Sequence, residues 1–132
     1  MKKELVHPEL SYKVTGLLFA VHNELGRYRN EKQYGDSIER YLKEFGIAYE
    51  RERVLPPSFA GEKERRNKID FVVANTIVLE IKAKRLLTKD DYFQIMRYLE
   101  GSKKRLGMLV NFRQKYLTPR RVLRGYEEQT YS

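Results

Sequence analysis

The chain has 132 residues, of which 41% are hydrophobic, so it is long enough and apolar enough for one folded domain with a core of its own. It contains no cysteine, which excludes disulfides and cysteine-ligated zinc. Its 27 lysines and arginines exceed its 18 aspartates and glutamates, and the net charge of +9 favours polyanionic partners, nucleic acid first and an anionic membrane second.

The hydrophobic segments of the chain are short. The longest apolar stretch inside a helical pattern covers residues 17–21 and cannot span a bilayer. The first residues also lack the apolar run of a signal peptide. We therefore expect a cytoplasmic protein without a membrane partner.

Two helices are predicted in the first third of the chain. The first begins at residue 8 or 11 and ends at residue 25, because Gly26 is a natural helix stop. Its apolar residues recur at helical spacing, at Val14, Leu17, Leu18, Val21 and Leu25. The second helix begins after Asn30, a good N-cap with Gln33 three residues later, and ends at Gly46.

Strands and one more helix follow. The strands are predicted at residues 47–55, 68–73, 77–82 and 106–112, of which the second and third are the arms of a hairpin. Residues 59–66 are predicted to be a loop or a turn between short strands. The third helix begins at Thr88, with Asp91 in a variant of the capping box, and ends at Gly101.

These elements predict an α/β domain over residues 8–114, in the order α-α-β-β-β-α-β. One central mixed sheet flanked by helices is the architecture that this order favours. Residues 115–132 are polar and basic, and we expect them to form a poorly constrained tail, with at most a short helical stretch.

The segment 68–82 carries the clearest chemistry, because Glu80 and Lys82 are two residues apart on one strand and point to the same face. A two-residue turn in the hairpin would place Asp70 opposite Leu79, mixing polar with apolar residues. A three-residue loop at 74–76 instead pairs Ile69 with Ile81, Phe71 with Leu79 and Val73 with Ile77, so that one face is wholly apolar. We expect this second register, which sets Asp70 opposite Glu80 and Lys68 opposite Lys82.

Two facing carboxylates repel each other unless a positive charge lies between them. A hard divalent cation meets this need, and the carbonyl of Ile81 could add a third ligand to Asp70 and Glu80. Lys82 would then lie beside the metal, able to orient or deprotonate a water or to stabilise charge on a phosphate. The residues alone leave a second interpretation equally open, in which Lys68 and Lys82 neutralise the two acids on a solvated face.

The D-x9-E-I-K spacing from Asp70 to Lys82 resembles the motif of the PD-(D/E)XK nuclease superfamily, with Ile69 in place of the motif's proline. From about residue 9 to residue 112, the chain also resembles one branch of it, the GxxExxY family. The matching segments are, in order, VHNELG at 21–26, EKQY at 31–34, QIMRYL at 94–99 and LGMLVNF at 106–112. Tyr28 stands where that family has its leading glycine.

The resemblance implies a restriction-endonuclease-like core that binds Mg2+ or Mn2+ and hydrolyses nucleic-acid phosphodiesters. It makes Asp70 and Glu80 metal ligands and Lys82 the catalytic lysine. It also implies that Glu31 reaches the same metal cluster. The alternative for Glu31 is an exposed glutamate in the first turn of its helix, a position that the helix dipole favours. We expect Gln94 to line the cleft, and Tyr98, one turn later, either to line it or to have a structural role.

Basic residues near the proposed site in sequence are expected to contact phosphates without reading the base sequence; they are Lys84, Arg85, Lys103, Lys104 and Arg105. The leading function is a metal-dependent nuclease, with DNA favoured over RNA. The rival is a catalytically silent module that keeps the nuclease fold to bind nucleic acid or to regulate. A third interpretation is a protein-interaction domain whose charge serves solubility, and the intact Asp, Glu and Lys set favours the enzyme over both.

Overall fold

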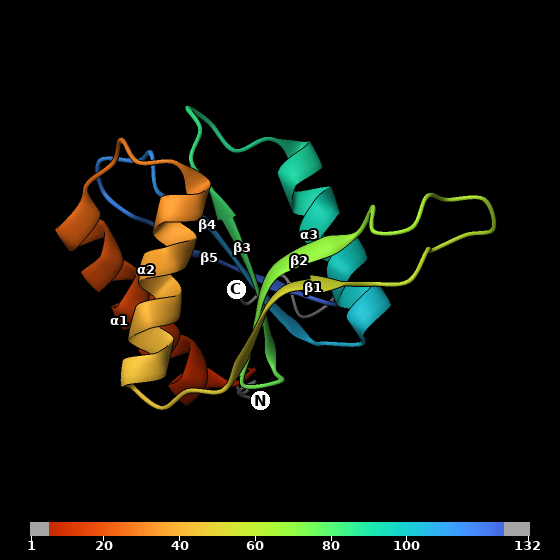
Figure 1. Ribbon diagram of the computed structural model, residues 1–132, viewed down its shortest axis with the longest axis horizontal. Coiled ribbons are helices and arrows are strands. Elements are labelled where there is room, and N and C mark those ends of the chain that lie inside the picture. Colours follow the sequence, from red (N-terminus) through yellow and green to blue (C-terminus); the bar gives the residue numbers. More distant parts are fainter. Residues whose placement is uncertain (1–5, 126–132) are drawn as a thin grey trace, which may run out of the picture.

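A computed structural model describes residues 6–125 of the chain, which form three helices and one five-stranded sheet (Figure 1). The helices are α1 (Pro8–Leu25), α2 (Glu31–Glu44) and α3 (Lys89–Ser102). The strands are β1 (Tyr49–Val54), β2 (Lys68–Val73), β3 (Ile77–Lys82), β4 (Leu106–Asn111) and β5 (Arg120–Leu123). The predicted α/β class and the order of its seven elements are confirmed. None of the three helices is long and apolar enough to cross a membrane.

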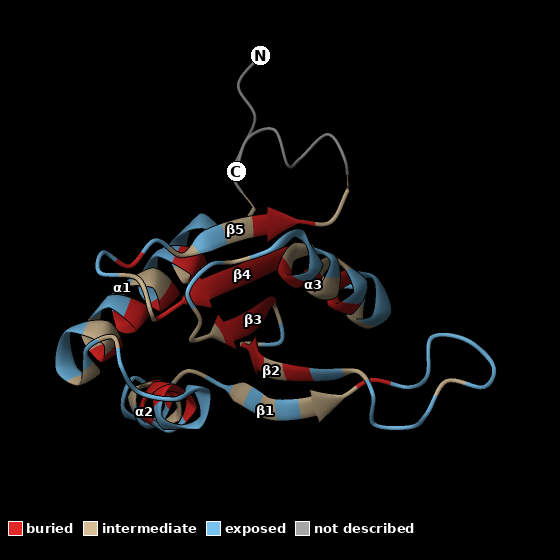
Figure 2. Ribbon diagram, turned by 90° about the horizontal axis from the view of Figure 1, so that it is seen from above, coloured by how far each residue is buried: buried red, intermediate tan, exposed pale blue. Residues whose placement is uncertain are grey.

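The sheet lies between two layers of helices (Figures 1 and 2). Helices α1 and α2 cover one face and α3 covers the other. The strand order is β1-β2-β3-β4-β5, and neighbouring strands are antiparallel except for β3 and β4, which are parallel and joined through α3. The two parallel strands are almost entirely buried, as expected where both faces of a sheet are covered.

Local hydrogen bonds fix the starts of two helices at the predicted residues. The N–H of Gln33 donates to the Asn30 side chain and the N–H of Asn30 donates to the Gln33 side chain, both at 2.9 Å. At α3, the N–H of Thr88 donates to Asp91 Oδ2 at 2.7 Å. The predicted stop at Gly101 is slightly early, because α3 continues to Ser102.

The hairpin register was predicted correctly near its turn and wrongly at its open end. Phe71 pairs with Leu79 and Val73 pairs with Ile77, as expected for the three-residue loop. However, Ile69 packs in the core on the α3 side, whereas Ile81 packs in the core under α1 and α2, so these two residues do not share a face. Regular pairing between β2 and β1 is also interrupted at Asp70. The facing residue of β1, Glu52, has a left-handed backbone conformation with φ 57°.

The segment predicted as a tail contributes a fifth strand. Strand β5 pairs antiparallel with β4 and buries Val122 and Leu123. Leu117, in the connection before it, is also buried. The prediction failed because a four-residue strand that begins with two arginines has no readable apolar period. Residues 126–132 of the predicted tail lie outside the described part of the chain.

Candidate active site

Asp70 and Glu80 meet where β2 and β3 stop pairing through their backbones. Beyond the pair Phe71–Leu79, side chains replace the usual backbone bonds. The N–H of Ile81 donates to Asp70 Oδ2 at 2.8 Å, and the N–H of Asp70 donates to Glu80 Oε2 at 3.1 Å. Each carboxylate is thus fixed on the opposite strand, and the two carboxyl groups lie next to each other.

The electrostatics of this pair favour a bound cation. Glu80 is only 2% exposed, and its pKa is raised well above the ordinary value, mainly because burial disfavours the charged form. The hydrogen bond to the Asp70 carboxyl and the charge of that carboxyl raise it further, against smaller opposing effects of the Asp70 N–H and of Lys82. The pair therefore binds a proton or another positive charge in preference to carrying two negative charges.

The donor set fits a hard divalent ion such as Mg2+ or Mn2+, which prefers carboxylate, carbonyl and water oxygens. The N–H and C=O of one strand residue point to the same neighbouring strand, so the Ile81 carbonyl points towards β2, as its N–H does. Among residues 6–125, no group of three or more His, Cys, Asp or Glu side chains is arranged so that it could hold a metal ion by itself. An ion held by Asp70, Glu80 and the Ile81 carbonyl would therefore keep several other positions for water or substrate oxygens.

Lys82 lies on the α3 side of the sheet, where its neighbours orient it. Its Nζ donates to Gln94 Oε1 at 2.8 Å and lies 3.9 Å from Asp91 Oδ1. Glu80 is two residues earlier on the same strand and shares this face. The structure thus brings Gln94 into the site, through Lys82.

Glu31, the first residue of α2, approaches from the other side of the sheet. Its Oε2 accepts a bond from the N–H of Ala83 at 3.3 Å, just beyond the end of β3. Glu31, Asp70 and Ile81 line one hollow of about 170 Å³, together with Lys32 and Arg51. Glu31 is an exposed residue, but it lies at the same hollow as Asp70.

The predicted phosphate-binding residues fall into two separate groups. Lys84 and Arg85 follow the site directly, although Lys84 Nζ is paired with Asp91 at 2.7 Å. Residues 103–105 immediately precede β4, whose Leu106 pairs with Ile77 at the start of β3. Lys104 Nζ accordingly donates to Asn75 in the hairpin turn, so this group lies about 17 Å from Lys82, at the far end of β3.

Two buried polar residues near the site were missed as site residues. Asp91, predicted only as a helix cap, also binds Lys84 and lies near Lys82. Asn111, paired in register with Lys82, accepts from the N–H of Lys84 at 3.1 Å and donates to its carbonyl at 2.8 Å. A polar residue at the end of a buried apolar strand was the available signal for Asn111.

A mixed sheet between helices, with an acidic pair at the parting of two strands and a lysine two residues beyond, defines a nuclease-type core. The sequence model of the PD-(D/E)XK nuclease superfamily matches residues 8–122. The chain therefore belongs to the PD-(D/E)XK nuclease superfamily, and its helices and five-stranded sheet form a restriction-endonuclease-like core. Neither the curated proteins nor the solved structures gave a significant match to the chain.

Proposed function

We propose that this protein is a metal-dependent nuclease that hydrolyses phosphodiester bonds of DNA, with Mg2+ or Mn2+ as its cofactor. The observation that carries the proposal is the pair of adjacent carboxyl groups of Asp70 and Glu80, each bonded to the opposite strand, with Lys82 on the same face as Glu80. Membership of the superfamily supports the reaction class.

The side chains of Asp70 and Glu80 and the carbonyl of Ile81 would hold the ion. When bound, such an ion supplies positive charge that neutralises a phosphate and makes attack by water easier. Lys82 contributes a second positive charge, which stabilises the negative charge that develops on the phosphate oxygens. Gln94 is neutral, so its hydrogen bond orients the ammonium without cancelling its charge.

We also assign the chain to the GxxExxY branch, on the role that Tyr34 has in placing Glu31. Tyr34 is fully buried and stacks on Phe112 with ring centroids 4.2 Å apart. Its hydroxyl donates to the Gly26 carbonyl at 2.6 Å and accepts from the N–H of Arg29 at 3.2 Å. The loop that leads into α2 is thereby fixed, which places Glu31 at the hollow it shares with Asp70. We propose that Glu31 assists metal or water binding there.

Lys84 and Arg85 are proposed to contact substrate phosphates beside the site. Lys84 would exchange its pairing with Asp91 for a phosphate, an exchange of one anionic partner for another. The preference for DNA over RNA and the cytoplasmic location stay predictions.

The experiment is a cleavage assay on single- and double-stranded DNA and RNA with Mg2+, Mn2+ or EDTA. We expect cleavage of DNA that requires a divalent ion and is lost in Asp70→Asn and Glu80→Gln. Lys13→Ala, an exposed change on α1, is the control for purification and folding. A wild-type protein that binds DNA but cleaves none of these substrates with either ion would instead support the silent binding module.

A further inference from the structure

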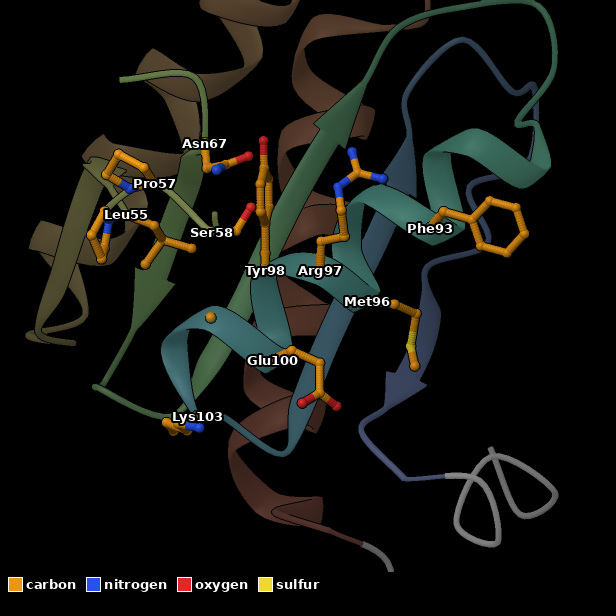
Figure 3. Close-up of a pocket in the computed structure, with 12 residues that line it drawn as sticks. Leu55, Pro57, Ser58, Asn67, Phe93, Met96, Arg97, Tyr98, Glu100 and Lys103 are labelled. Carbon is orange, nitrogen blue, oxygen red and sulfur yellow. The ribbon is translucent and has the colours of Figure 1, made fainter. Parts of the chain in front are cut away.

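A groove of about 700 Å³ runs along α3 on the face of the sheet that carries Lys82 (Figure 3). One wall is the connection between β1 and β2, which projects beyond α3 (Figures 1 and 2). The other wall is the outer side of α3. The residues that line the groove are Leu55, Pro56, Pro57, Ser58, Asn67, Phe93, Met96, Arg97, Tyr98, Glu100, Gly101 and Lys103.

Tyr98 connects this groove to the candidate active site. Figure 3 shows its side chain between the residues of the β1–β2 connection and Arg97. Tyr98 is buried in the same core cluster as Ile69, the residue that precedes Asp70. Gln94, the partner of Lys82, lies one helical turn earlier on α3. Asp70, Glu80 and Lys82 do not line the groove, so a nucleic-acid chain that occupies it would continue past Gln94 to reach the acidic pair.

The connection that forms the first wall is fixed at its base. Glu62 Oε1 accepts bonds from the N–H of Ser58 at 2.7 Å and from Asn67 Nδ2 at 2.9 Å. The Leu55 side chain also packs close to Gly101 of α3. The groove is therefore formed before a ligand arrives, which lowers the entropy lost on binding.

The chemistry of the groove combines apolar surface with positive charge. Proline, leucine and methionine side chains line it. Phe93 is 56% exposed at its outer edge, where Figure 3 shows the ring directed away from the β1–β2 connection. The connection 56–67 and the lining residues together contain five basic residues, Lys63, Arg65, Arg66, Arg97 and Lys103, against three acids, Glu62, Glu64 and Glu100. The carboxylate of Glu62 is already engaged by Ser58 and Asn67.

We propose that this groove binds the unpaired bases of a single-stranded nucleic acid whose backbone continues to Asp70 and Glu80. The inference rests on the proposed function, which supplies nucleic acid as the substrate, and it deepens that function by naming the substrate class. Phosphates gain nothing from contact with an apolar wall, and the bases of a duplex are stacked on one another inside the duplex. Unpaired bases, in contrast, can stack on exposed aromatic rings beside basic side chains.

The test is equilibrium binding of a fluorescent oligothymidylate and of a duplex of equal length, in EDTA at one salt concentration. Wild type should bind the oligothymidylate more tightly than the duplex. Phe93→Ala should weaken oligothymidylate binding by about 5- to 150-fold, the range for losing one base–aromatic stack, and should leave duplex binding nearly unchanged. The control is Phe45→Ala, because Phe45 is equally exposed, at 60%, and follows α2 on the other side of the sheet.

Equal oligothymidylate affinity of wild type and Phe93→Ala, or tighter binding of the duplex by wild type, would overturn the proposal. Melting temperatures of all variants verify that exposed-residue changes leave the fold intact. If the wild-type protein cleaves duplex DNA with Mn2+ but Phe93→Ala binds oligothymidylate like wild type, the proposed nuclease function stands and the proposed role of the groove fails. If oligothymidylate binding depends on Phe93 but no substrate is cleaved, the role of the groove stands and the nuclease function fails.

Discussion

Replacing Lys82 by alanine would separate catalysis from substrate affinity. The Lys82 side chain is only 18% exposed, and its ammonium is held by the neutral Gln94 at 2.8 Å, with Asp91 at 3.9 Å. The variant therefore removes one oriented positive charge beside the acidic pair. Asp91 keeps its closer partner, Lys84 at 2.7 Å, so the change does not leave a buried acid without a cation.

The two expected effects differ in size. Removing a group that stabilises charge in the transition state lowers the rate by about 10²- to 10⁴-fold. Lys82 is one of 27 lysines and arginines, and a single partly exposed ionic contact contributes about 0.2–1 kcal/mol, or roughly 1.5- to 5-fold in affinity. The loss of rate should therefore exceed the loss of affinity by at least an order of magnitude.

The assay pairs single-turnover cleavage in Mg2+ or Mn2+ with DNA binding in Ca2+ or EDTA, at one salt concentration. Lys13→Ala is the matched lysine control, and it should behave like wild type in both measurements. The reasoning is refuted if Lys82→Ala cleaves as fast as wild type, or if its rate and affinity fall by the same factor.

Three further predictions concern the metal site and the elements that support it. Because burial and Asp70 raise the pKa of Glu80, the metal-free protein should lose stability as the pH rises above the ordinary glutamate pKa of about 4.3. Asp70→Asn should make this loss smaller in EDTA, and it should abolish the stabilisation of the protein by Mn2+. Both effects are measured by thermal melting at several pH values. Tyr34→Phe should lower the free energy of unfolding by about 1–3 kcal/mol in urea, since it leaves the buried bond to Gly26 unmade; an unchanged value would contradict the role of the hydroxyl. Asp91→Ala should lower it by about 0.5–2 kcal/mol, because it removes both the bond to the N–H of Thr88 at the start of α3 and the ion pair with Lys84. The exposed Asp90→Ala should change it little, and equal effects of the two variants would contradict these roles of Asp91.

The parts of the fold that depend on neighbouring residues could be predicted from the sequence. The caps at Asn30 and Thr88 use residues three positions apart, so both helix starts were visible. The hairpin pairs nearest the turn follow from side-chain alternation. Ile69 could not be placed in this way, because regular pairing of β2 is interrupted at Asp70 and Ile69 packs on the α3 side.

The site was predictable where its residues share one segment, and less so where topology joins distant segments. Asp70, Glu80 and Lys82 lie within 13 consecutive residues, and alternation alone puts the last two on one face. Residues 103–105 follow α3 closely in sequence, but the parallel pairing of β3 with β4 carries them to the opposite end of the sheet. Strand β5 was missed for a similar reason, since it is stabilised by its pairing with β4 and not by a pattern of its own.

The most direct test of the central claim is an anomalous difference map from crystals of the protein soaked in Mn2+. We predict a peak about 2 Å from a carboxylate oxygen of Asp70, from one of Glu80 and from the Ile81 carbonyl, and no such peak in Asp70→Asn crystals. A soaked wild-type crystal without a peak between these two carboxylates, or with the same peak in Asp70→Asn, would contradict the metal site and the nuclease mechanism that depends on it.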